Sequence, residues 1–150
     1  MDLAELHPRN NLNLCLMGGM TELLSIIFSH ESDQVRQTAC SLLTSIMSNN
    51  RQVQEFASKS GAINLVSQFE RETSPASKSS VFSCLTSWLK ADNFEGKRRF
   101  ISEQDGLDFL ARLVCEAGSD AEFNTRLKTN VHRLLSDLIL NDDGIFEDRP

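Results

Sequence analysis

Apolar residues along this chain recur at the three- and four-residue spacing of amphipathic helices, and short polar or glycine-containing breaks separate the helical stretches. The stretch that follows Ser32 is the clearest case. Its apolar positions, which are expected to form one buried side, are Val35, Ala39, Leu42, Leu43 and Ile46. Helices are predicted over residues 10–17, 20–28, 33–48, 51–58, 62–71, 76–90, a short segment after Asn93, 107–115 and 122–140.

Residues that favour turns or helix ends occupy the breaks. Ser32 and Ser74 can cap the helices that follow them, because a side-chain oxygen accepts a hydrogen bond from an unsatisfied N–H of the first turn. Pro75 belongs to the break before the helix at 76–90, because proline favours a helix start, where no N–H is needed. Further breaks are predicted at His7-Pro8, Gly18-Gly19, Asn49-Asn50 and Gly118–Asp120, and the polar residues 143–150 are expected to form a tail.

The chain resembles itself when it is shifted by 42 residues. The shift places Gly19 on Gly61 and lays LLTSIM, which begins at Leu42, over CLTSWL, which begins at Cys84. Trp88 then takes the position of Ile46, so we expect it to be a large buried side chain of the second unit. A further copy begins at Gly106, and its last helix carries LLSDLI.

A period in the low forties, with three helices per unit, is typical of armadillo-type helical solenoids. The sequence therefore predicts an all-α fold: a right-handed α-solenoid of about three armadillo-like three-helix repeats. The predicted repeats cover residues 7–48, 49–92 and 93–142 of a single domain that spans 1–150.

Charge and hydropathy narrow the classes of partner. The net charge of −6 disfavours nucleic acid, because binding to a phosphate backbone needs a basic surface. We interpret the one basic run, GKRRF at residues 96–100, as the solvated side of a short helix. No apolar run is long enough for a membrane span or a signal peptide. This favours the cytoplasm, and the endoplasmic-reticulum lumen is the alternative if a leader preceded Met1.

The sequence carries no recognisable catalytic motif. Four cysteines lie far apart without metal-ligand spacing, and we interpret Cys40 and Cys84 as reduced thiols packed in the core. The histidines are isolated, and His132 is expected to be a partly packed side chain. We therefore expect no enzyme, no cofactor and no metal.

Two groups of residues resemble a known family. Asn49, Asn50, Gln54 and Glu55 follow the Gly18-Gly19 pair by one helical unit, and RLKTNVHRLLSDLIL lies downstream. Their order and spacing resemble the armadillo-type nucleotide-exchange factors of Hsp70 chaperones, the Fes and Sil type that includes the mammalian Hsp70-binding protein. The resemblance implies a non-enzymatic regulator that clamps lobe II of the Hsp70 nucleotide-binding domain, opens its cleft and speeds the release of ADP.

In this architecture the third helix of each unit lines the concave face, which leaves a polar stripe beside the buried apolar positions. The expected contact residues are Gln34, Gln37, Thr38, Ser41 and Ser45 in the first unit, Ser80, Ser83 and Ser87 in the second, and Asn130, Arg133 and Asp137 in the third. Arg133 alone among them has the chemistry of an interface anchor. No asparagine ladder follows the stripe, which disfavours a peptide receptor of the nuclear-import type.

Two other functions remain as alternatives. The same face could serve a scaffold that binds a different protein. A structural oligomer could join solenoid ends through Ile145 and Phe146, although we expect a monomer.

Overall fold

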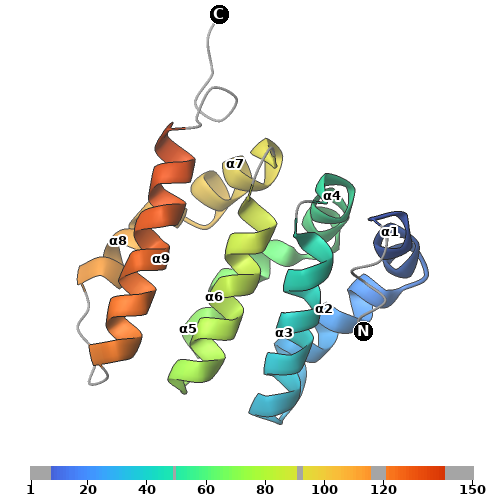
Figure 1. The fold of residues 1–150 in the computed structure, drawn as a ribbon, viewed down its shortest axis with the longest axis horizontal. Coiled ribbons are helices and arrows are strands. Elements are labelled where there is room, and N and C mark those ends of the chain that lie inside the picture. Colours follow the sequence, from blue (N-terminus) through green and yellow to red (C-terminus); the bar gives the residue numbers. More distant parts are fainter. Residues whose placement is uncertain (1–7, 49, 91–92, 116–120, 141–150) are drawn as a thin grey trace, which may run out of the picture. The chain divides into compact units, whose positions relative to one another are not determined.

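The computed structural model describes residues 8–48, 50–90, 93–115 and 121–140, and their regular structure is entirely helical (Figure 1). This confirms the all-α class. The helices are α1 (Pro8–Leu16), α2 (Gly19–Ser29), α3 (Asp33–Met47), α4 (Arg51–Ser60), α5 (Leu65–Arg71), α6 (Pro75–Leu89), α7 (Phe94–Glu103), α8 (Gly106–Cys115) and α9 (Ala121–Leu140), and a 3₁₀ turn, η2 (Ala62–Asn64), precedes α5. The chain packs as two compact groups, one ending at Gly96 and the other beginning at Lys97.

The predicted caps at Ser32 and Ser74 are confirmed, whereas α1 and α6 begin before the predicted residues 10 and 76, and α5 begins after residue 62. Ser32, Asn50 and Ser74 each accept a hydrogen bond from the backbone N–H three residues later, at 3.3, 3.2 and 3.1 Å. Pro75 is the first residue of α6. The start of the chain before Pro8, Asn49, the break at 118–120 and the tail at 143–150, with Ile145 and Phe146, lie outside the described residues.

In the first group, α1–α3 and α4–α6 form two stacked triplets. Each helix of one triplet packs on its counterpart in the other: α1 on α4, α2 on α5, and α3 on α6. Gln37 Nε2 donates to Ser77 Oγ at 3.0 Å near the start of α3 and α6, and Ser87 Oγ donates to the Thr44 carbonyl at 3.0 Å near their ends. The two helices are therefore parallel and side by side (Figure 1), in the register that the 42-residue repeat predicts.

The core of this group is built around the C-terminal end of α6. Trp88 is fully buried, as predicted, and its indole N–H donates to Ser58 Oγ at 2.8 Å. Gln54 Nε2 donates to the Ser87 carbonyl at 2.9 Å, and Asn93 Nδ2 donates to the Trp88 carbonyl. The last carbonyls of a helix have no partner within it, so these amides supply the missing hydrogen bonds.

In the second group, α8 packs on α9, and the Phe100 and Phe109 rings meet edge to face with centroids 6.4 Å apart. Lys97 is fully buried, and its Nζ lies 3.1 Å from Asp137 Oδ2. The interpretation of 96–100 as a solvated run is therefore wrong for Lys97, because Asp137 offers a partner for its charge inside the group. It holds for Arg98, which is exposed.

The predicted burial of four further residues is confirmed for two of them and wrong for the other two. Cys40 and Cys84 are buried, as predicted, and burial and a hydrogen bond with Cys40 raise the pKa of the Cys84 thiol. Val35, predicted to be buried, is 38% exposed in the first turn of α3. His132 is exposed rather than partly packed, because its neighbours Val131 and Leu134 occupy the inward side of α9.

Candidate protein-binding face

The outward polar sides of α3 and α6 form one surface, which we call the α3–α6 face. On α3 the buried positions Ala39, Leu43 and Ile46 fix the inward side, and helical spacing turns the residues between them outward. On α6, Val81, Phe82 and Leu85 have the same role. Because α2 packs on α3 and α5 packs on α6, the inward sides are covered, and many outward residues of α3 and α6 are exposed within the described part of the chain (Figure 1). The α3–α6 face consists of Gln34, Gln37, Thr38, Ser41, Ser45, Ser80 and Ser83.

Exposure differs along this face. Gln34, Thr38, Ser41 and Ser83 are exposed, whereas the other three residues are half-buried. The Thr38 hydroxyl donates to the Gln34 carbonyl at 2.9 Å and thus follows its own helix. Small hydroxyls along two parallel helices allow another protein surface to approach closely and leave hydrogen-bonding atoms available to it.

One predicted contact residue of α6 does not belong to the face. Ser87 is only 3% exposed, and its hydroxyl is turned toward α3, where it donates to the Thr44 carbonyl at 3.0 Å. The prediction that Ser87 contacts a partner is therefore wrong. The 42-residue shift aligns Ser87 with Ser45, which is half-buried. Ser87 is more buried because its side chain lies between α6 and α3 of the preceding triplet.

The third set of predicted contact residues lies on α9, in the second group. Arg133 is exposed and Asn130 is half-buried. Asp137 is half-buried, and its carboxylate pairs with the buried ammonium of Lys97 at 3.1 Å. Its charge therefore neutralises Lys97 within the group, so Arg133 is the more suitable residue of α9 for an interface.

A charged pair at the junction of the two triplets was not predicted from the sequence. Arg36 Nε and Nη2 donate to the two carboxylate oxygens of Glu72, at 2.9 and 2.8 Å, and we call this pair the Arg36–Glu72 clamp. Gln68 Nε2 also donates to Glu72, at 2.7 Å. Burial would by itself raise the pKa of Glu72, but the hydrogen bonds from Arg36 and Gln68 outweigh burial and hold that pKa below its usual range.

The clamp joins more than two helices. Arg36 Nη1 donates to the carbonyls of His30 and Glu31, at 2.6 and 3.1 Å, and Nη2 also pairs with Asp33. Only 14% of the Arg36 side chain and 2% of the Glu72 side chain are exposed. No sequence motif marks this pair. Its members are 36 residues apart, and the 42-residue shift repeats the basic residue, placing Lys78 on Arg36, but aligns the carboxylate of Glu72 with His30.

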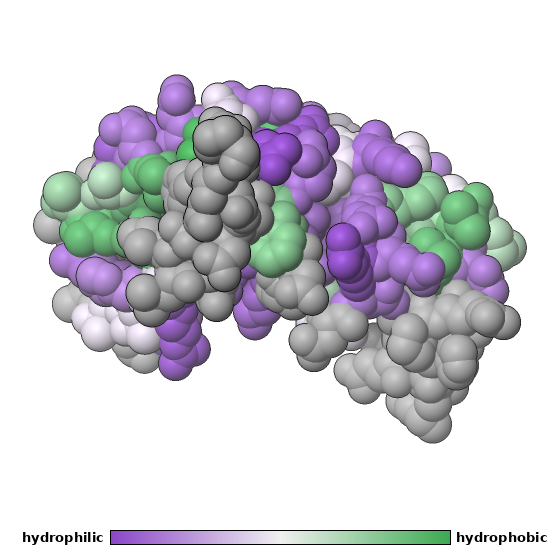
Figure 2. Space-filling view, turned by 90° about the horizontal axis from the view of Figure 1, so that it is seen from above, coloured by the Kyte–Doolittle hydropathy of each residue, from purple (hydrophilic) through white to green (hydrophobic). Residues whose placement is uncertain are grey.

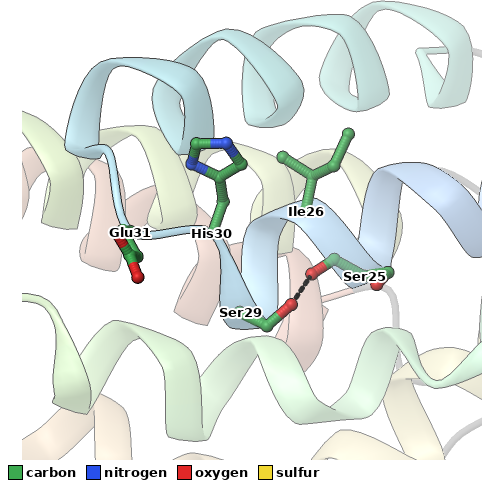
Figure 3. A pocket seen from close by; sticks show the side chains of 5 residues that line it. All are labelled: Ser25, Ile26, Ser29, His30 and Glu31. Carbon is green, nitrogen blue, oxygen red and sulfur yellow. Dashed lines mark hydrogen bonds between the residues drawn. The ribbon is translucent and has the colours of Figure 1, made fainter.

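A small hollow lies at the end of α2 (Figure 3). Its side chains are already engaged locally: Ser29 Oγ donates to the Ser25 carbonyl at 2.6 Å, and His30 Nδ1 accepts the Ser32 N–H at 3.0 Å. The remaining lining residues are Ile26 and Glu31. The hydroxyls of Ser25 and Ser29 are not paired with a base among these lining residues, so the hollow does not have the arrangement of a nucleophilic site.

The rest of the described surface adds little specific chemistry. Among the described residues, no group of three or more histidine, cysteine, aspartate or glutamate side chains could hold a metal ion. None of the described helices has both the length and the apolar content that a membrane crossing requires. Figure 2 shows hydrophobic side chains at both ends of the view. Leu14 and Leu16 of α1 and the following Met17 are exposed apolar residues.

Comparison with known proteins gives one match. The model of the family described as the SIL1/FES1/HPBP1 C-terminal domain matches residues 10–149. No curated protein matches the chain. No solved structure matches it either.

Proposed function

Since the chain belongs to the SIL1/FES1/HPBP1 C-terminal domain family, which consists of non-enzymatic nucleotide-exchange factors of Hsp70 chaperones, we propose that it binds lobe II of the Hsp70 nucleotide-binding domain and promotes the release of ADP. The match over residues 10–149 carries the proposal, because it includes every helix that contributes to the candidate face. Family members act in the cytosol or in the endoplasmic-reticulum lumen; for this chain we propose the cytoplasm, with the lumen as the alternative.

The proposed mechanism needs no catalytic residue. A factor that binds the open conformer of the nucleotide cleft more tightly than the closed one shifts the population toward the open conformer, from which ADP leaves. By reciprocity, bound nucleotide weakens the affinity of the factor by the same ratio. What the factor must supply is a surface that fits one conformer better than the other.

The proposed surface is the concave side of a right-handed solenoid of three repeats within one domain, with α7, α8 and α9 as the third repeat. The burial pattern supports a third repeat: a shift of 44 residues places buried Ala62 on buried Gly106, and Leu65 on Phe109. On this surface, the α3–α6 face and the α9 residues Asn130 and Arg133 contact lobe II. The chain acts as a monomer, without nucleic acid or membrane.

The experiment follows the release of fluorescent ADP from a cytosolic and from an endoplasmic-reticulum Hsp70 at increasing concentrations of the chain. The proposal predicts faster release from at least one of them. Ser83→Arg, which places a large side chain on the face, should weaken binding about 5- to 150-fold, because overpacking costs about 1–3 kcal/mol. The same change at an exposed position of α5, Ser67→Arg, serves as the control and should have no effect.

Failure to accelerate release from either Hsp70 would refute the exchange-factor proposal. The alternative would then be a generic armadillo-repeat scaffold that binds another protein through the same face. That alternative predicts that Ser83→Arg disrupts a complex other than the one with Hsp70.

A further inference from the structure

The Arg36–Glu72 clamp lies near the N-terminal ends of α3 and α6, the two helices that carry the α3–α6 face. Arg36 is between Gln34 and Gln37 of the face along α3, and Glu72 follows the last residue of α5. Five residues of the face belong to α3 of the first triplet and two belong to α6 of the second. The geometry of the face therefore depends on the angle between the triplets, and the clamp spans that junction.

The chemistry of the clamp is suited to fixing an angle. A guanidinium group that donates to both oxygens of a carboxylate holds the two groups in one plane, which a single hydrogen bond does not do. Gln68 fixes the carboxylate from the α5 side, and the His30 and Glu31 carbonyls fix the guanidinium from the end of α2. The guanidinium therefore joins α2, α3 and the end of α5 in one arrangement.

Stability alone does not account for an ion pair in this place. Burial of two charges is costly, and well-packed apolar side chains of similar volume often stabilise a fold equally well or better. Elsewhere the two triplets are already joined by the α3–α6 core and by the Ser87 hydrogen bond to Thr44. The clamp adds a contact of fixed direction between the two triplets.

We propose that the Arg36–Glu72 clamp holds the first two triplets at a fixed angle and thereby allows the α3–α6 face to discriminate between the open and the closed conformer of its partner. This inference rests on the proposed function. A ligand shifts a conformational equilibrium only by the ratio of its affinities for the two conformers. A face that could adjust its angle would fit both conformers, so its ratio would approach one. Arg36 and Glu72 are positioning residues in this account and need not touch the partner.

The test measures the affinity of each variant for the Hsp70 nucleotide-binding domain, once with ADP and once without nucleotide. The wild-type chain should bind the nucleotide-free domain about 5- to 150-fold more tightly. Glu72→Gln should lower that ratio by about 2- to 30-fold, the range over which single substitutions change coupling. The maximal acceleration of ADP release should fall with the ratio.

Two controls separate positioning from stability. Glu55→Gln makes the same substitution in the exposed Arg51–Glu55 pair of α4 and should leave the ratio unchanged. Val53→Ala opens a cavity in the core of α4, so it should lower the free energy of unfolding without changing the ratio. Arg36→Lys keeps the charge but loses the two-oxygen geometry, and it tests the proposal if Glu72→Gln does not fold.

Unchanged ratios in both clamp variants, or an equal loss in Val53→Ala, would overturn the inference while leaving the proposed function intact. A wild-type ratio of one would instead refute the proposed function, and the inference with it.

Discussion

At the scale of single residues, polar side chains of α3 and α6 fall into two classes that look alike in the sequence. Ser41 and Ser83 are exposed on the α3–α6 face, whereas Ser87 is buried and donates to α3. Arg36 and Glu72 are charged but mostly buried at the junction of the triplets. A polar residue of these helices can therefore form a buried hydrogen bond between the triplets, or it can lie on the surface.

The pH dependence of stability should reveal the clamp. The folded-state pKa of Glu72 is lowered, so its contribution is complete above the unfolded-state pKa of about 4.3 and is lost as pH falls through the folded-state pKa. At pH 7, Glu72→Gln should lower the free energy of unfolding by about 1.5–3 kcal/mol, the usual value for hydrogen bonds to charged groups. Urea unfolding from pH 7 to pH 3 should show this difference shrinking, and a difference that stayed constant with pH would contradict the account.

The hydrogen bond from Trp88 to Ser58 makes a second residue-scale prediction. Ser58→Ala removes the acceptor and leaves a buried indole N–H without its partner, which should cost about 1–3 kcal/mol. In the Trp88→Phe background the same change should cost clearly less, because no N–H remains. A double-mutant cycle by urea unfolding measures the difference, and equal costs in the two backgrounds would show that the bond has no energetic role.

At the scale of elements, the turns before α2, before the 3₁₀ turn η2 and before α8 share one feature. Gly18, Gly61 and Asp105 have positive φ values of 96°, 107° and 49°, and each precedes a helix or the 3₁₀ turn. After Gly18 and after Asp105, the next helix begins with a glycine, Gly19 or Gly106, beside which there is little space for a side chain. A Cβ on Gly106 would contact the Phe100 ring and lie 2.7 Å from the Phe100 carbonyl oxygen.

Gly106→Ala should therefore strain the second group more than the addition of a single methyl group suggests. Since backbone as well as the ring must move, we expect a loss of about 1–3 kcal/mol, as for overpacked cores. Asp108→Ala, on the exposed side of the same helix, should change stability by no more than about 0.5 kcal/mol. Thermal unfolding of the two variants gives the comparison, and equal midpoints would show that the site relaxes freely.

The elements were largely predictable from the sequence, because their signals are local. Spacing of apolar residues located the helices, and the oxygen-bearing side chains of Ser32, Asn50 and Ser74 marked helix starts. The exposed part of the candidate face followed from the same spacing. The Arg36–Glu72 clamp and the burial of Lys97 were not predictable, because each depends on a partner 36 or 40 residues away that only the packed chain brings near.

At the scale of the whole molecule, repetition gives the function a physical basis. The first two triplets stack in register, so like helices lie side by side and their outward sides form one face. Such a face is broader than any single helix can offer, which suits the folded surface of a chaperone lobe better than a small ligand. The family to which residues 10–149 belong indicates the same kind of partner.

The most direct measurement places a photocrosslinking amino acid at Ser83, on the α3–α6 face, and in a second variant at Lys59, on α4. Each variant is irradiated with nucleotide-free Hsp70, and the crosslinked peptides are identified by mass spectrometry. The account predicts that position 83 crosslinks to lobe II of the nucleotide-binding domain and that position 59 does not. Crosslinks from position 83 only to other parts of Hsp70, or stronger crosslinks from position 59, would contradict it.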